Sequence, residues 1–98
     1  MLIEKVKNKY GAGDILAFKT VAGDEIVGKV VEIADGAYEL NKPCIIVTSS
    51  EGIGLIQAQF GLDPDLENLI LRDQHIITMC RAHEKMRDHY VTVVNTPV

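Results

Sequence analysis

Cys80 and His83 are the first residues whose types and spacing could do chemistry, because a thiolate and an imidazole separated by two residues are common zinc ligands. His89 follows a short distance later. A structural zinc site needs about four ligands, however, and no second pair accompanies this one. We therefore expect no metal, and we interpret Cys80 as a buried thiol beside a surface histidine.

An acidic stretch offers a second possible chemistry. Asp63, Asp65 and Glu67 alternate within residues 61–68, and their carboxylates could hold a calcium ion weakly. The spacing lacks the full EF-hand pattern, so we interpret the stretch as a solvated acidic loop. The chain contains no nucleophile elbow, phosphate-binding glycine loop or pair of catalytic carboxylates. We therefore expect a protein that is not an enzyme and has no cofactor.

The stretch 82–90 combines strong helix formers with the absence of Gly and Pro, which predicts a helix. Met86 and Tyr90 are four residues apart, so one face of this helix could dock on the rest of the protein. The same region carries three cationic side chains interspersed with acidic ones, namely Arg81, Lys85 and Arg87. We interpret them as a solvated helix face, with a phosphate-contacting patch as the alternative.

Composition limits the classes of partner. The chain has 14 Asp and Glu against 10 Lys and Arg, a net charge of -4, which disfavours general binding to duplex DNA. No apolar run reaches the ~18–20 residues of a membrane helix, so we expect no membrane association. Residues 1–10 lack the apolar core of a signal peptide, which indicates a cytoplasmic protein. With 98 residues, the chain is expected to form a single domain over 1–98.

Turn signals recur roughly every ten residues, which is typical of an all-β barrel or sandwich. Residues 1–14 form a lead-in whose first ten residues predict either a helical turn or an extra strand. The predicted barrel covers 15–79 and contains five strands, at 15–20, 25–33, 38–49, 53–60 and 69–79. Asp35-Gly36 predicts a tight hairpin turn, and Pro43 marks a bulge or an edge position.

The second predicted strand has an irregular apolar pattern. Ile26, Gly28 and Val30 keep the two-residue period of a strand, but the step from Val30 to Ile33 is three residues. A β-bulge or a sharp bend explains this change of phase. Gly28 removes a side chain where a strongly curved strand would crowd its own interior. The pattern therefore predicts a short, bent strand of the kind that small barrels use.

Two motifs carry a resemblance to the Sm/LSm family. The first motif of that family is matched by glycines and apolar residues in register, with its aspartate one residue late because Ala34 is extra. The matching residues are Gly23, Ile26, Gly28, Val30, Ile33 and Asp35. The second motif is similar to Leu71-Arg72-Asp73-Gln74-His75-Ile76, where Asp73 stands in place of the usual glycine. Lys19-Thr20, Pro43 and His75-Ile76-Ile77 also resemble small Sm-like proteins of tailed bacteriophages.

The resemblance implies a five-stranded, strongly bent SH3-like (Sm-like) barrel with a C-terminal helix, in a bacterium or a phage-infected bacterial host. Family members form closed rings by pairing the fourth strand of one subunit with the fifth strand of the next. The predicted strands at 53–60 and 69–79 are apolar and carry few charges. An uncovered edge of that kind favours association. We therefore expect a homo-oligomeric ring that pairs through strands 4 and 5.

The resemblance also implies single-stranded RNA binding near the ring pore, with Asp35, Tyr38, Arg72 and His75 at the site. An aromatic ring and a guanidinium could clamp a base between them. Glu39 occupies the position of the base-reading asparagine, and its charge would repel phosphate. Alternatively, Tyr38 is a core residue and Arg72 pairs with an aspartate. In that case the ring is a structural or protein-interaction module that binds no nucleic acid.

Overall fold

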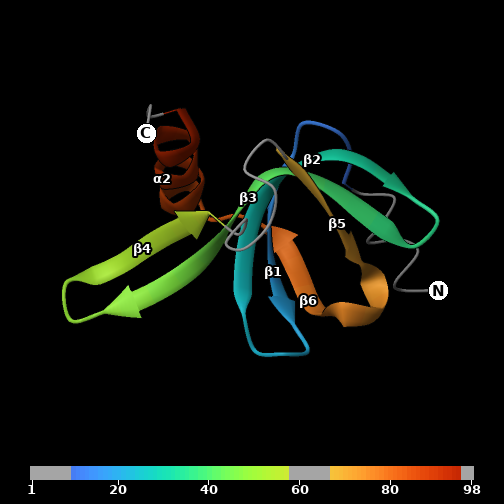
Figure 1. The fold of residues 1–98 in the computed structure, drawn as a ribbon. Coiled ribbons are helices and arrows are strands. Elements are labelled where there is room, and N and C mark those ends of the chain that lie inside the picture. The colour runs from blue at the N-terminus through green and yellow to red at the C-terminus, as the bar shows by residue number, and fades with distance from the viewer. Residues whose placement is uncertain (1–9, 58–66, 96–98) are drawn as a thin grey trace.

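A computed structural model of the chain describes residues 10–57 and 67–95. The described part is mostly antiparallel β-sheet with one C-terminal helix, α2 (Glu84–Asn95) (Figure 1). A single turn of 3-10 helix, η1 (Asp73–His75), separates the last two strands. The six strands are β1 (Ile15–Thr20), β2 (Glu25–Ala34), β3 (Ala37–Ser49), β4 (Gly52–Gln57), β5 (Asn68–Arg72) and β6 (Ile76–Arg81).

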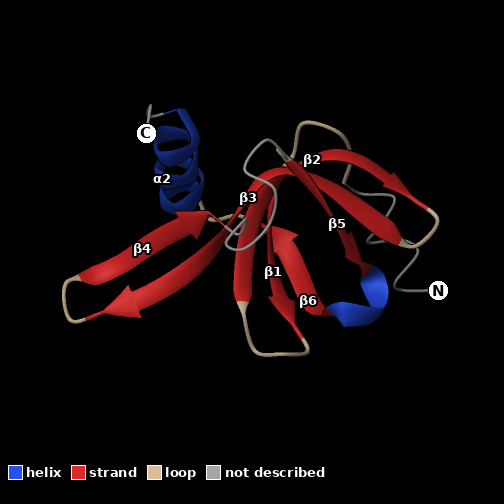
Figure 2. Cartoon of the chain, in the orientation of Figure 1, coloured by secondary structure: helices blue, strands red, loops and turns tan. Residues whose placement is uncertain are grey.

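The strands follow the order β4-β3-β2-β1-β6, and β5 pairs with β3 beside the path. The long strand β3 therefore has two partners along one edge: its first part pairs with β5, and its last part pairs with β4. Figure 2 shows the hairpin of β3 and β4 projecting away from the other strands. Among the described residues no pairing joins β6 to β4 or β5, so the sheet is not closed.

The β class and the C-terminal helix are confirmed, whereas two details of the predicted barrel are wrong. The sheet has six strands rather than five, because η1 interrupts the predicted fifth strand at 69–79. The predicted strongly bent barrel is also wrong, since the sheet is neither closed nor strongly curled. The predicted strand at 53–60 corresponds to β4, and its last three residues lie outside the described part. The predicted helix at 82–90 begins later and continues to Asn95.

The irregular pattern of β2 has the predicted cause. The pairing between β2 and β3 shifts register between Val30 and Glu32, and Val30 and Ile33 both pack into one core cluster. A second shift lies next to Pro43, where Lys42 has a φ of 46°. Proline cannot donate to the ladder, so this bulge lies where the sequence predicts an interruption.

Gly28 lies where the strands crowd each other. A β-carbon placed on Gly28 would lie 3.3 Å from Leu40 Cβ and 3.5 Å from Pro43 Cα. The contact with Leu40 is tight enough that a side chain at position 28 would push Leu40 aside, whereas the distance to Pro43 is ordinary van der Waals contact. The glycine therefore allows β2 and β3 to approach closely at the bulge. The turn after β2 also behaves as predicted, because Asp35 and Gly36 have φ values of 51° and 73°.

The main core lies between five of the strands. Its fully buried members come from β1, β2 and β3, and they are Leu16, Phe18, Val30, Tyr38 and Leu40. Leu71 of β5 and Ile76 and Met79 of β6 pack against them. This core therefore holds β5 and β6 in place beside the three central strands.

A second core lies under α2. Val27 and Cys44 of the sheet pack with Ala82 and Tyr90, and Met86 covers them. The predicted docking face of the helix is therefore confirmed. Burial raises the pKa of the Cys44 thiol to about 11 and that of Tyr90 to about 12.

Some predictions fall outside these elements. Residues 1–9 of the predicted lead-in lie outside the described residues. Residues 58–66 do as well, and they include Asp63 and Asp65 of the acidic stretch. Within the described part, no helix has the length and apolar character needed to cross a bilayer.

Candidate functional site

Two turns that are distant in sequence meet at one end of the sheet. Ala37 pairs with Arg72 across β3 and β5, and the Asp73 N–H donates to the Gly36 carbonyl at 2.8 Å. The Asp73 carboxylate lies against the turn, because a β-carbon on Gly36 would be only 3.0 Å from its Oδ2. The structure therefore brings the Asp35-Gly36 turn to the junction of β5 and η1.

Arg72 is exposed at this junction. Among the described residues, Arg72 forms no ion pair, with Asp35 and Asp73 included. The alternative in which Asp73 or Asp35 neutralises Arg72 is therefore not what the described part of the structure shows. Its guanidinium remains available to a ligand, although both nearby aspartates make the surroundings acidic.

Tyr38 does not lie with the other candidates on the surface. Its side chain is 1% exposed, and its ring packs edge-on against Phe18 with centroids 5.6 Å apart and planes at 67°. A ring in this position cannot stack on a base unless the core opens. The structure thus places Tyr38 in the core, as the alternative interpretation of the sequence has it.

His75 lies at the other end of η1 from Arg72 and is exposed. Its carbonyl accepts a hydrogen bond from the Val21 N–H at 2.8 Å, which ties η1 to the turn after β1. The imidazole Nε2 is 3.5 Å from Gln74 Nε2. The backbone of η1 therefore positions His75 near Arg72, with the ring open to solvent.

The outer surface beside Arg72 carries two carboxylates. Glu32 and Glu39 lie opposite each other in the pairing of β2 and β3, and they border a hollow of about 130 Å³. Asn68 Nδ2 donates to Glu39 Oε2 at 2.9 Å, which fixes that carboxylate. Ile70, 66% exposed, completes the hollow. We call Glu32, Ala34, Ala37, Glu39 and Ile70 the acidic face.

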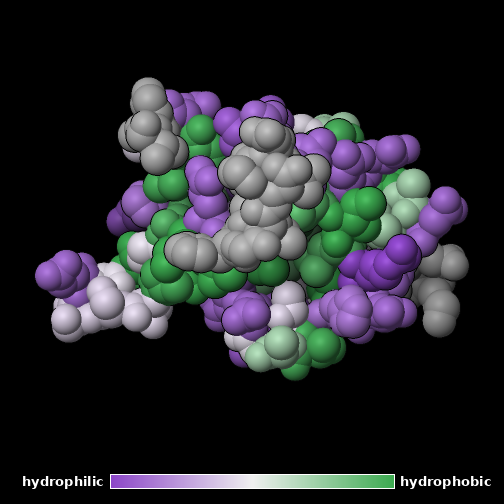
Figure 3. Space-filling model, viewed as in Figure 1, coloured by the Kyte–Doolittle hydropathy of each residue, from purple (hydrophilic) through white to green (hydrophobic). Residues whose placement is uncertain are grey.

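A groove lies between α2 and β4. The sequence singled out two of its residues separately, His83 as half of a metal pair and Lys85 in the alternative of a phosphate-contacting patch. The groove has a volume of about 440 Å³, within the ~300–1,000 Å³ range of ligand pockets. We call its lining residues Ile53, His83, Lys85, Met86 and His89 the basic groove. The sequence did contain a signal, because every second position from 81 to 89 is Arg, Lys or His. Figure 3 shows hydrophobic surface where α2 meets β4 and again over β5.

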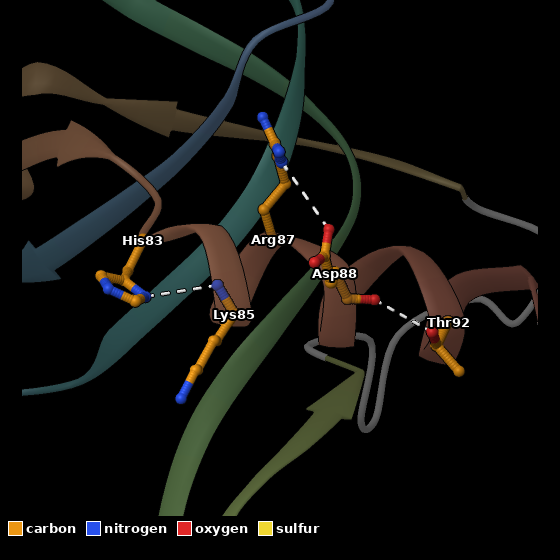
Figure 4. Close-up of polar contacts among 5 residues, drawn as sticks. All are labelled: His83, Lys85, Arg87, Asp88 and Thr92. Carbon is orange, nitrogen blue, oxygen red and sulfur yellow. Dashed lines mark hydrogen bonds and ion pairs between the residues drawn. The ribbon is translucent and has the colours of Figure 1, made fainter.

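His83 has a structural task at the start of α2. Its Nδ1 accepts the Lys85 N–H at 3.2 Å, so the ring caps a helix donor that would otherwise lack a partner (Figure 4). The figure also shows Arg87 projecting away from His83 and Lys85, toward its contact with Asp88 at 4.0 Å. The cationic residues of this region thus divide between two sides of the helix.

The cysteines differ in their surroundings. Cys44 is buried, whereas Cys80 is exposed on β6, so the interpretation of Cys80 as a buried thiol is wrong. Within the described residues, no group of three or more His, Cys, Asp or Glu side chains is arranged to hold a metal ion.

Comparison with known protein families and with characterised proteins finds no match for this chain. The function is therefore argued from the residues and their geometry alone. Three features of the described structure bear on the function. They are the junction of Arg72 with the Asp35-Gly36 turn, the acidic face, and the edge strands β5 and β6.

Proposed function

We propose that this protein is an Sm-like assembly module that forms a homo-oligomeric ring by strand pairing. The observation that carries the proposal is that β5 and β6 are both edge strands of one sheet whose five strands β5-β3-β2-β1-β6 pack around a common core. In this interpretation the fold is an open variant of the SH3-like barrel. This proposal departs from the predicted pairing, which used the strand at 53–60. Because β4 belongs to the projecting hairpin, β5 and β6 act here as the fourth and fifth strands.

The backbone of β6 supports this proposal. The Ala82 N–H donates to the Ile15 carbonyl at 3.0 Å, and antiparallel pairs alternate in hydrogen bonding. The backbone N–H and C=O groups of Cys80 therefore face β1, whereas those of Met79 and Arg81 face away from the sheet. Among the described strands nothing pairs with these outward groups, and such an edge is a template for a strand of another chain.

The same alternation applies to β5. The Asp73 N–H donates to the Gly36 carbonyl, so the backbone N–H and C=O groups of Leu71 and Leu69 face β3. The backbone groups of Ile70 and Arg72 point to the outer edge. Besides the edge at β4, each copy thus offers two unlike edges, at β5 and β6. Pairing β5 of one copy with β6 of the next closes a ring if the rotation permits it.

The test uses light scattering after size exclusion at micromolar concentration. We expect a mass several times the 10.8 kDa of one chain. Arg81→Pro removes an outward N–H from β6 and should reduce the mass, because edge strands tolerate proline but then cannot donate. The control Arg81→Thr loses the same side chain but keeps the N–H, so it should retain the parent mass. A monomeric parent, or equal masses for all three proteins, would refute the ring.

Single-stranded RNA binding at Arg72 is the second candidate function. The specific observation in its favour is the exposed guanidinium beside the Asp35-Gly36 turn, which forms no ion pair with any residue that the structure describes. With Tyr38 in the core, the proposed site reduces to Asp35, Arg72 and His75. Stacking of one base on a guanidinium or an aromatic ring contributes about 1–3 kcal/mol, so binding at this reduced site is weak.

Fluorescence anisotropy with labelled oligo-U and oligo-A, at low and moderate salt, tests this candidate. We expect saturable binding that Arg72→Ala weakens, while Arg87→Ala on the far side of α2 leaves it unchanged. Equal binding by the parent and Arg72→Ala would remove this site assignment. No binding at low salt would leave assembly as the function of the module.

A further inference from the structure

The acidic face and the basic groove are complementary in charge and similar in apolar content. The acidic face presents Glu32 and Glu39 around the exposed Ile70. The basic groove presents Lys85 and two histidines around Ile53, which is 58% exposed. The acidic face thus combines two carboxylates with an exposed isoleucine, and the basic groove combines one lysine and two imidazoles with another. Surfaces of this kind can bury their isoleucines together while the lysine meets a carboxylate.

The charged groups of both surfaces are available for contact. Among the described residues, neither Lys85 nor Glu32 has an ion-pair partner. Glu39 accepts from Asn68 through Oε2, and a carboxylate can accept several hydrogen bonds. An intermolecular ion pair would therefore not have to break an existing one.

The hydrogen bond by which His83 caps α2 leaves the other ring nitrogen of His83 able to donate. Because Nδ1 accepts the Lys85 N–H, the proton of the neutral ring resides on Nε2. Nε2 then points its N–H away from the helix backbone, on the side from which Lys85 also projects (Figure 4). Lys85 and His83 therefore offer two adjacent donors to a carboxylate-bearing surface.

The two surfaces lie at different ends of one molecule. Figure 1 shows α2 and β4 at one end of the sheet and β5 with the first part of β3 at the other. One chain cannot bring them together, and contact of either surface with its own copy would oppose like charges. The complementary arrangement is a head-to-tail contact between two copies, which generates rings or open chains.

We propose that the acidic face of one copy binds the basic groove of a second copy. The isoleucines pack against the neighbouring surface, and Lys85 pairs with Glu32 or Glu39 of the next molecule. This contact uses side chains on the sheet surface and the helix, and it does not require the β5–β6 edge pairing proposed above. It therefore adds a second, charge-dependent interface to the assembly.

Charge reversal tests the contact in a way that folding defects cannot imitate. Lys85→Glu makes both surfaces acidic, and the double variant Glu32→Lys, Glu39→Lys makes both basic. Each variant alone should show at least a fivefold weaker self-association in a dilution series followed by sedimentation velocity. An equimolar mixture should recover it, because every surface then meets one of opposite charge. Association of the parent should weaken as salt increases.

Matched controls use exposed charges outside both surfaces. Lys19→Glu on β1 changes the charge by the same amount as Lys85→Glu. Glu51→Lys, on the turn before β4, makes one of the two charge changes of the double variant, and both controls should keep the parent behaviour. Failure of the mixture to recover association, or equal loss in the controls, would overturn the proposal. Weaker oligo-U binding by Lys85→Glu at unchanged mass would also overturn it and would assign the groove to nucleic acid.

The two interfaces can fail separately. If Arg81→Pro lowers the mass while the charge variants behave as the parent, the edge pairing is supported and the charge contact is refuted. If Arg81→Pro retains a salt-sensitive association that Lys85→Glu abolishes, the charge contact stands and the edge pairing falls.

Discussion

Tyr90→Phe should destabilise the fold through the loss of one hydroxyl group. The Tyr90 hydroxyl accepts the Lys29 N–H at 3.2 Å and donates to the Asn41 carbonyl at 2.6 Å. Lys29 and Asn41 are opposite each other in β2 and β3, next to the bulge at Lys42. The hydroxyl therefore bridges two strands where the register of their own ladder shifts, and it fixes α2 to the sheet.

The magnitude follows from those two contacts. A hydrogen bond contributes about 0.5–1.5 kcal/mol net, and an unsatisfied buried partner costs about 1–3 kcal/mol. The phenylalanine ring keeps the packing on Val27 and Cys44, so only the polar part is lost. We expect a decrease of about 1–3 kcal/mol in the free energy of unfolding. Because each kcal/mol of lost stability lowers the melting temperature of a small domain by ~4–8 °C, the decrease should be measurable by thermal unfolding.

Urea unfolding followed by far-UV circular dichroism measures this loss. Tyr90→Ala serves as the comparison, because it also removes the ring and should cost about 3–5 kcal/mol. A Tyr90→Phe variant within about 0.5 kcal/mol of the parent would refute the bridging role, since surface substitutions usually stay within that range. In that case, packing of the ring alone would hold α2 on the sheet.

Three further outcomes follow from individual buried or exposed groups. Burial raises the pKa of Cys44 from 9.0 to about 11 and that of Tyr90 from 10.0 to about 12. The preference of the fold for the neutral forms therefore contributes its full stability below pH 9. The free energy of unfolding, measured by urea titration, should decrease as the pH rises toward 12. Iodoacetamide should label the exposed Cys80 in the native protein, and Cys44 only after unfolding; mass spectrometry that shows both labelled at once would contradict the burial of Cys44. The buried Thr20 hydroxyl has no hydrogen-bond partner among the described residues, so Thr20→Val should keep or increase the stability, and a loss above about 1 kcal/mol would reveal a missed partner.

The local geometry of β2 and β3 could be predicted because short-range rules determine it. The step of three residues between Val30 and Ile33 predicts the bulge, and Pro43 predicts the second interruption. A two-residue turn at Asp35-Gly36 sets the register of the hairpin, so the pairing of Glu32 with Glu39 follows from the sequence. These features depend on backbone sterics over a few residues, which the sequence expresses directly.

The predicted fifth strand failed for a reason that the sequence also contains. Arg72 to His75 are four consecutive polar residues, which breaks the alternation that a continuous strand needs. The chain turns through η1 there and separates β5 from β6. The resemblance to the Sm/LSm family drew attention to Arg72 as a ligand and away from the break in the pattern.

Tyr38 shows the same conflict between a motif and a periodicity. Tyr38 and Leu40 are two apart on β3, so they share the face that packs into the core, while Glu39 takes the opposite face. Alternation alone therefore predicts a buried ring. The motif position suggested that Tyr38 stacks on a base. The side chain is buried instead, as the alternation predicts.

Long-range placement is what the sequence could not supply. Nothing in residues 68–72 indicates that Ile70 lies opposite Glu39, or that α2 forms a groove with Ile53. The acidic face that results is unfavourable within one chain, because like charges directly opposite each other on neighbouring strands destabilise a sheet. A cationic surface brought by another molecule would offset this repulsion. The opposed carboxylates are thus easier to explain as half of a contact than as part of an isolated fold.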